Sequence, residues 1–204
     1  MSKGKFITLE GSEGSGKSTQ SALLVEYLKK KKYPVMLLRE PGGVKISEQI
    51  RALLLDVQTK NMCNACETLL YMAARAQLVQ EVLRPQLNKG MVIICDRFLD
   101  STIAYQGAGN GVDVNAIEQI GQFATDGIKP DLTLLFDIDA AKGLSRTAPK
   151  KDRIEQRPLA YHQRVRQGYL DLARRNPERI KVIPVLGSKE EVFELVKANV
   201  EKIL

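Results

Sequence analysis

The sequence predicts an α/β fold in which a five-stranded parallel sheet lies between two layers of helices. Short apolar runs suited to buried strands alternate with segments of helical periodicity along the whole chain. A glycine-rich segment at residues 11–18 separates the first predicted strand from the first helix. Folds of this kind bind ligands at the carboxyl ends of their strands. We expect one domain that spans residues 1–204.

The first half of the chain supplies three strands and three helices. Strands are predicted at residues 5–10, 35–38 and 91–95, of which the last is a continuous apolar run typical of a buried parallel strand. Helices are predicted after Gly16, around residues 46–54, and over residues 66–87, where Pro85 is the first breaker. The second strand ends in a Pro/Gly loop at residues 39–43.

The second half continues the alternation. Strands are predicted at residues 132–138 and 181–185, and helices at residues 115–123, 140–146, 159–175 and 190–203. The segment at residues 147–158 interrupts the pattern because it is highly charged and almost free of apolar residues. Such a segment is usually a solvated loop, but beside a phosphate-binding loop we predict a mobile lid.

Composition excludes several classes of protein. An apolar fraction of 44% over 204 residues is enough for a substantial core. No apolar run approaches the roughly 18 residues of a membrane span, and the chain enters a strand at once, so we expect a cytoplasmic protein without a membrane partner. The net charge of +7 suits nucleotides, and the few aromatic residues argue against a nucleic-acid platform.

The cysteines do not predict a disulfide framework or a metal centre. Cys63, Cys66 and Cys95 make an odd count, which fits a reducing compartment. Cys63 and Cys66 have the spacing of a zinc-binding pair, but only Cys95 and His162 remain to complete four ligands. We interpret the pair as two small residues before a helix.

The glycine-rich segment G-S-E-G-S-G-K-S predicts a phosphate site for an ATP-like donor. Its backbone N–H groups can turn toward a phosphate, Lys17 supplies a mobile cation, and the Ser18 hydroxyl can hold Mg²⁺. The predicted ATP-binding residues are Gly11, Ser12, Glu13, Gly14, Ser15, Gly16, Lys17, Ser18 and Thr19. A carboxylate beside phosphates is costly, so Glu13 should face a second ligand.

Four further segments carry charged or aromatic side chains suited to a phosphoryl acceptor. They are R-E-P-G-G at residues 39–43, Arg51, Y-M-A-A-R at residues 71–75, and D-R-F at residues 96–98. Taken singly, each has an ordinary structural explanation, such as a core tyrosine or a surface ion pair. Their co-occurrence at strand ends and on neighbouring helices predicts a second binding site facing the same crevice.

At these motifs the sequence resembles the thymidylate kinase family, most closely its bacterial branch. The resemblance is carried by the glycine loop with its internal acidic residue, R-E-P-G-G, I-R-A-L-L-L-D, L-L-Y-M-A-A-R-A-Q-L-V, D-R-F-L-D-S-T-I-A-Y-Q-G and D-R-I-E-Q. It implies a P-loop nucleoside monophosphate kinase fold and Mg²⁺-dependent phosphorylation of dTMP to dTDP by ATP. It also implies a homodimer, through helices that carry Leu69, Leu78 or Val82.

Residue by residue, the resemblance assigns an acceptor site and a metal site. The implied dTMP-binding residues are Glu13, Arg39, Arg51, Tyr71, Arg75, Arg97, Ser101, Thr102, Tyr105 and Gln106. Arg51 and Arg97 would bind the acceptor phosphate, Tyr71 would stack on thymine, and Glu13 would accept the deoxyribose 3′-hydroxyl. Asp96 would hold Mg²⁺ together with Ser18, with Glu10 a weaker candidate.

The predicted catalytic residues are Lys17, Arg97 and the lid residue Arg153. The glycine loop contains no arginine, as in the bacterial branch that the sequence resembles, and the resemblance implies that the lid supplies the cation over the transferred phosphoryl group; Lys150, Lys151 and Arg157 are the other candidates. Glu155 would orient lid or substrate groups. No general base is required, because a nucleotide phosphate has a second pKa of about 6 and is already largely dianionic at neutral pH.

Two alternatives stay open at this point. The chain could be a P-loop kinase of another nucleoside monophosphate or of a deoxynucleoside, because acceptor choice depends on a few side chains. It could also be a nucleotide-binding switch module without transfer activity, which would leave the acceptor-side residues without a purpose.

Overall fold

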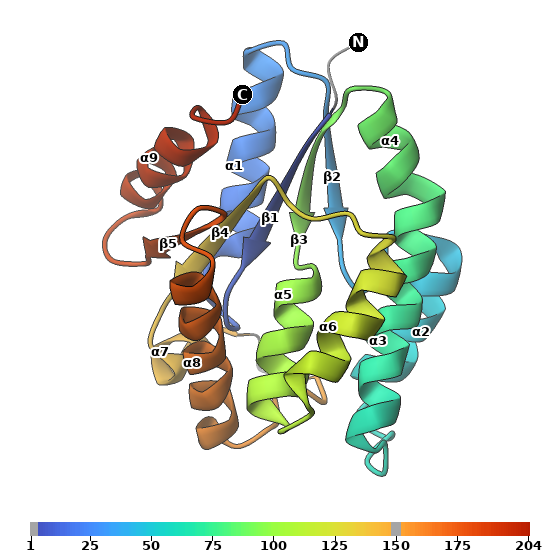
Figure 1. Ribbon diagram of the computed structural model, residues 1–204. Helices are drawn as coiled ribbons and strands as arrows, with labels where there is room; N and C mark the ends of the chain where they lie inside the picture. Colours follow the sequence, from blue (N-terminus) through green and yellow to red (C-terminus); the bar gives the residue numbers. More distant parts are fainter. Residues whose placement is uncertain (1–3, 148–151) are drawn as a thin grey trace.

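The computed structural model describes residues 4–147 and 152–204 and contains the predicted five-stranded parallel sheet (Figure 1). The strands are β1 (Lys5–Glu10), β2 (Val35–Arg39), β3 (Val92–Asp96), β4 (Leu132–Asp137) and β5 (Ile180–Pro184). Their order in the sheet is β2-β3-β1-β4-β5, and every neighbouring pair is parallel. The order reverses between β1 and β3, so a crevice is expected where these two strands end.

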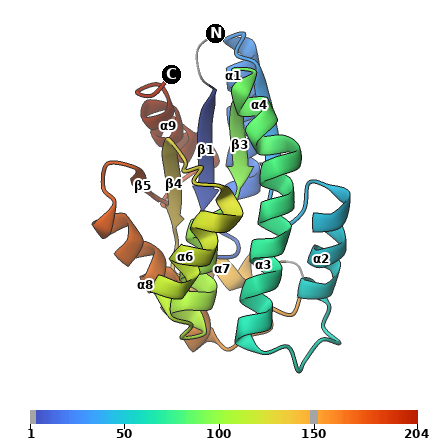
Figure 2. The same ribbon diagram turned by 45° about the vertical axis from the view of Figure 1, so that its right-hand side comes forward.

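Helices cover both faces of this sheet, as predicted (Figures 1 and 2). They are α1 (Lys17–Lys30), α2 (Lys45–Leu55), α3 (Asn64–Leu78), α4 (Arg84–Asn88), α5 (Leu99–Thr102), α6 (Val114–Thr125), α7 (Ala140–Ser145), α8 (Leu159–Arg175) and α9 (Lys189–Val200). Side chains of α1 and α9 pack with Ile7 and Leu9 of β1 in one core cluster. Phe6 faces the opposite side, where it packs with residues of α3 and the segment that follows it.

The long helix predicted over residues 66–87 is present but is not regular. It begins at Asn64, where Cys63 is the N-cap residue and its sulfur accepts a hydrogen bond from the backbone N–H of Cys66. A π-helical segment, η1 (Val79–Leu83), interrupts it before α4. The wider turn precedes Pro85, whose nitrogen cannot donate a hydrogen bond, so the ladder is rearranged there without ending the helix.

A helical segment that the sequence does not predict follows β3. It consists of the short helix α5 and a π-helical segment, η2 (Ile103–Gly109). The segment is stabilised by its packing on α8: a side chain at Gly109 would collide with Tyr161, and one at Gly168 would collide with Ala108. Because close approach and not periodicity holds it in place, the apolar pattern gives no helix signal.

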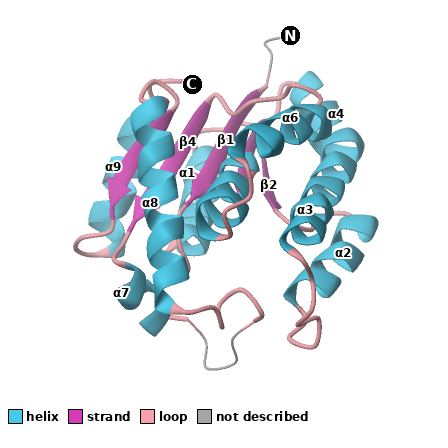
Figure 3. Cartoon of the chain, turned by 60° about the horizontal axis from the view of Figure 1, so that its bottom comes forward, coloured by secondary structure: helices cyan, strands magenta, loops and turns pink. Residues whose placement is uncertain are grey.

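The carboxyl ends of the strands form the end of the molecule that carries the site. Figure 3 turns this end forward and shows α7 and α8 on one side and α2 and α3 on the other. Of the predicted lid at residues 147–158, Lys150 and Lys151 lie outside the described residues. Within the described chain, no helix is both long and apolar enough to cross a membrane.

Candidate active site at the carboxyl ends of the strands

The glycine loop between β1 and α1 has the conformation that its sequence predicts. Gly11 and Gly14 adopt φ angles of 139° and 64°, and a side chain at either would collide with a backbone carbonyl, of Phe136 or Gly143 respectively. The ammonium group of Lys17 bonds the carbonyl oxygens of Gly11 and Ser12 at 2.9 and 2.8 Å. Lys17 therefore spans the loop that would hold phosphates.

Lys17 is almost completely buried, and this makes its ammonium group easier to deprotonate. Burial, followed by the positive charge of Arg97, lowers the pKa of Lys17 to about 8, although nearby carboxylates oppose the shift. A phosphate arriving beside the ammonium group would restore the missing negative charge. The loop is therefore electrostatically incomplete without an anion.

Ser18 and Asp96 form a pair suited to Mg²⁺. The Ser18 hydroxyl lies 3.2 Å from Oδ2 of Asp96, at the end of β3. The other oxygen, Oδ1, is buried and has no hydrogen-bond partner among the described residues. A hydroxyl and a carboxylate beside a phosphate loop are the oxygen ligands that Mg²⁺ prefers, so these residues fit the ion. Glu10 is occupied elsewhere, because it accepts hydrogen bonds from Phe98 and Ser101.

A cavity of about 300 Å³ opens from the glycine loop toward α2, α3 and η2. It brings together most of the predicted residues: Glu13, Lys17, Ser18, Arg51, Tyr71, Arg75, Asp96, Arg97, Ser101, Thr102, Tyr105, Gln106 and Glu155. Donor-side and acceptor-side residues thus line one continuous space, whose size suits a small ligand. Arg39 does not line it, because its guanidinium pairs with Glu48 on the surface at 2.6 Å.

Arg97 lies at the junction of the two sides. Its guanidinium donates to the carbonyl oxygen of Gly11 at 3.1 Å and to the hydroxyl of Tyr105 at 2.9 Å. Its backbone φ of 75° is unfavourable for a residue with a side chain. Strained residues of this kind are concentrated at functional sites, where surrounding contacts hold them. The arrangement aims a fixed positive charge at the space between the glycine loop and the acceptor side.

Glu13 faces away from the loop, as the electrostatic argument predicts. It accepts a hydrogen bond from the Tyr105 hydroxyl at 2.6 Å and lies 3.3 Å from Arg97 and from Nδ1 of buried His162. Burial alone would raise the pKa of Glu13, but the His162 contact and the charge of Arg97 outweigh it and lower the pKa to about 2. Glu13 is therefore an ionised acceptor at neutral pH.

Arg75 and Tyr71 lie on the face of α3 that borders the cavity. Arg75 is only 2% exposed, and its donors reach Glu40, Thr102 and the carbonyl oxygen of Phe98. Burial raises the pKa of Tyr71 to about 12. Tyr71 is only partly exposed and lines the cavity, where an aromatic ring can stack on a planar base.

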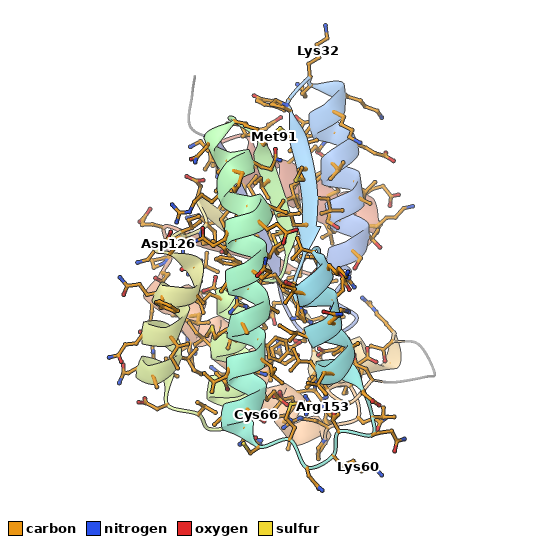
Figure 4. All side chains as sticks on the ribbon, turned by 90° about the vertical axis from the view of Figure 1, so that its right-hand side faces the viewer. Lys32, Lys60, Cys66, Met91, Asp126 and Arg153 are labelled. Atoms are coloured by element: carbon orange, nitrogen blue, oxygen red, sulfur yellow. The ribbon has the colours of Figure 1, made fainter. Side chains whose placement is uncertain are left out.

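The described part of the lid does not place Arg153 over the glycine loop. Nη1 of Arg153 lies 2.6 Å from Oε2 of Glu67, and its Nε donates to the carbonyl oxygen of Leu54. Arg157 reaches the same carboxylate oxygen at 2.9 Å. Figure 4 shows Arg153 at the end of the molecule where Cys66 and Lys60 lie. The catalytic assignment of Arg153 remains a prediction.

Several polar residues at the site are not among the predicted site residues. They include Glu67, Asn110, His162 and Tyr169, together with Glu40 and Asp152, which line the cavity. One signal could have found two of them. His162 and Tyr169 lie on the face of α8 that also buries Val165, so they are polar groups on an otherwise apolar stripe. Glu67 lies in the first turn of α3, where acidic residues are common, so its sequence position does not indicate that it is buried.

A parallel sheet with a glycine loop after β1, and one cavity that joins this loop to a second set of charged side chains, defines a P-loop phosphotransferase. The family model for thymidylate kinase matches residues 9–196. The chain therefore belongs to the thymidylate kinase family.

Individual members of this family match the chain over nearly their whole length. The chain is 46% identical to the thymidylate kinase of Symbiobacterium thermophilum, over 98% of this chain and 94% of the relative. It is also 46% identical to that of Deinococcus radiodurans, over 99% and 98%. The crystal structure of thymidylate kinase from Ehrlichia chaffeensis superimposes with a TM-score of 0.80 at 35% identity, and the match covers 98% of this chain and 99% of that one.

Proposed function

We propose that this protein transfers the γ-phosphoryl group of ATP to the phosphate of dTMP and so forms dTDP. The observation that carries the proposal is the single cavity that joins Lys17 of the glycine loop to Arg97 and to the base-side residues Tyr71 and Arg75. An acceptor bound there would direct its phosphate at the donor site. Phosphoryl transfer needs little more than such positioning and charge neutralisation.

In this mechanism the side chains position and neutralise the reactants. Lys17 would bind the donor phosphates, and Arg97, with Arg51, would hold the acceptor phosphate in line with them. Glu13, as an ionised acceptor, would bind a sugar hydroxyl. Ser18 and Asp96 would hold Mg²⁺, which neutralises charge on the donor phosphates when bound. The acceptor phosphate is already dianionic at neutral pH, so no side chain has to remove a proton.

Arg153 would act only after its guanidinium leaves Glu67 and binds the transferring phosphoryl group. The exchange is electrostatically reasonable, because the phosphates carry more negative charge than one carboxylate and Arg157 would stay on Glu67.

The homodimer also remains a proposal. Leu78 is buried inside the molecule, whereas Leu69 is 53% exposed on α3 and could contribute to an interface. The cytoplasmic location stays a prediction from the sequence.

A panel of acceptors with Mg-ATP tests the proposed function. We expect dTMP to give the highest kcat/KM, followed by dUMP, with AMP, GMP and unphosphorylated thymidine far lower. A clear preference for a purine monophosphate or for a nucleoside would refute the assignment. ATP hydrolysis without transfer to any acceptor would favour a nucleotide-binding switch instead.

A further inference from the structure

Glu67 is a fully buried carboxylate on α3, one helical turn before Tyr71. Among the described residues, four side chains donate to it. Oε1 accepts from Nε2 of Gln106 and Nδ2 of Asn110, both at 2.9 Å, and Oε2 accepts from Arg153 at 2.6 Å and Arg157 at 2.9 Å. The same carboxylate therefore holds the lid arginines and a residue that lines the acceptor side of the cavity.

The charge state of Glu67 follows from these neighbours. Burial would raise its pKa, but the hydrogen bond from Gln106 and the charges of Arg157 and Arg153 outweigh burial and lower the pKa. An ionised carboxylate can only accept hydrogen bonds. Every polar group that faces Glu67 must therefore turn a donor toward it.

This requirement fixes the side-chain amide of Gln106. An amide has a donor end and an acceptor end, and in most settings it can turn over to suit its partners. Here the donor end is held by Glu67, and no donor from the described residues reaches the oxygen end. Gln106 is only 1% exposed and lines the cavity, so its carbonyl oxygen is the end available to a ligand.

We propose that Glu67 is a specificity-determining positioning residue, which holds the Gln106 amide with its oxygen toward the acceptor base and so selects a pyrimidine that carries N–H at ring position 3. Thymine and uracil have this donor. Cytosine has a nitrogen without hydrogen at the same position. This nitrogen and the amide oxygen of Gln106 are both acceptors, so they would face each other without a hydrogen bond. The inference rests on the proposed function, because it concerns the base of the same acceptor.

The variant Glu67→Gln removes the constraint while keeping the size of the side chain. Arg153 and Arg157 need an acceptor, so they would turn the oxygen of the new amide toward themselves and its NH₂ group toward Gln106. The new NH₂ group would face both Gln106 and Asn110, so both of these amides would have to turn over and accept from residue 67. Gln106 would then present its own NH₂ group to the cavity. The acceptor site would lose its match to a ring N–H and gain one to a ring nitrogen acceptor.

The readout is the ratio of kcat/KM for dTMP to that for 5-methyl-dCMP. These nucleotides share the methyl group, the sugar and the phosphate, and differ only on the N3 and C4 edge of the base. We expect Glu67→Gln to lower this ratio by at least about tenfold, because a buried polar group left unpaired by the wrong partner discriminates strongly. The matched control is Glu81→Gln, which changes the exposed partner of Gln77 and should leave the ratio unchanged.

A purely structural role for Glu67 predicts a different result. Loss of packing would weaken both nucleotides equally, so an unchanged ratio in a folded Glu67→Gln protein would overturn the inference. Glu67→Asp keeps an acceptor-only group and should preserve the ratio even if both rates fall; a collapsed ratio there would contradict it as well. Should Glu67→Gln not fold, the double variant with Arg157→Gln restores the charge balance, keeps Arg153 as the orienting donor, and is expected to lower the ratio in the same direction.

The wild-type assay separates this inference from the proposed function. If the wild-type protein does not phosphorylate dTMP, the proposed function fails before any variant is compared. If the wild type phosphorylates dTMP and the ratio does not change in Glu67→Gln, only the role of Glu67 fails.

Discussion

The glycine loop and the lid are both predicted to supply a cation to the transferred phosphoryl group, yet the structure holds those cations differently. Lys17 lies across its own loop, on carbonyl oxygens five and six residues away. Arg153 is held by Glu67, which lies 86 positions earlier in the chain, on α3. The loop is thus determined by its local sequence, whereas the position of the lid depends on a distant buried carboxylate.

The strongest test of this contrast removes the loop cation. We expect Lys17→Met to lower kcat by at least about 10³-fold, because it removes a charge that is held at the donor phosphates before the reaction begins. Steady-state kinetics with Mg-ATP and dTMP measures the loss. Lys30→Met, at the exposed end of the same helix, is the matched control and should retain turnover. Turnover within tenfold of wild type in Lys17→Met would contradict the assignment.

The corresponding lid variant should have a smaller effect of the same kind. We expect Arg153→Ala to lower kcat by about 10²-fold with little change in dTMP affinity, because the arginine must first leave Glu67 to act. Arg174→Ala, which removes an exposed arginine of α8, is the control. If kcat is nearly normal and the KM for dTMP rises, Arg153 only anchors the lid to the acceptor side and is not catalytic.

Sequence patterns predicted the parts of the fold that depend on local periodicity. All five strands and the helices on both faces of the sheet are where the apolar pattern placed them. The helical segment at residues 99–109 was missed because its stability comes from close packing on α8 and not from an apolar stripe of its own. The π-helical turn before Pro85 was missed for a related reason, since periodicity does not report hydrogen-bond register.

In the candidate site, too, the features that depend on local sequence were predicted, and those that depend on contacts between distant segments were not. The electrostatic cost of Glu13 beside phosphates was enough to predict that it faces elsewhere, and the structure confirms the orientation. Arg39 was grouped with the acceptor site because it belongs to a motif there, yet its nearest carboxylate, Glu48, holds it on the surface. The roles of Glu67 and Asn110 depend on contacts between α3, η2 and the lid, which no single segment of sequence reveals.

The smallest expected effect concerns the pH dependence of the loop cation. The pKa of Lys17 in the free protein is about 8, lowered from its usual value by burial and by Arg97. Below this pH Lys17 is charged and ready for an anion; above it the free protein must take up a proton in order to bind ATP. The affinity for a non-hydrolysable ATP analogue should therefore be constant up to about pH 7.5 and fall about tenfold per pH unit beyond pH 8.

Calorimetric titrations at constant ionic strength between about pH 7 and pH 9.5 would show this dependence, because the nucleotide phosphates are already fully ionised over most of that range. Lys17→Arg is the matched control. Its guanidinium keeps its charge throughout the range, so its binding should be weaker but independent of pH. A wild-type affinity that stays level to pH 9.5 would mean that Lys17 remains charged in its buried position, and that the loop is complete before the nucleotide arrives.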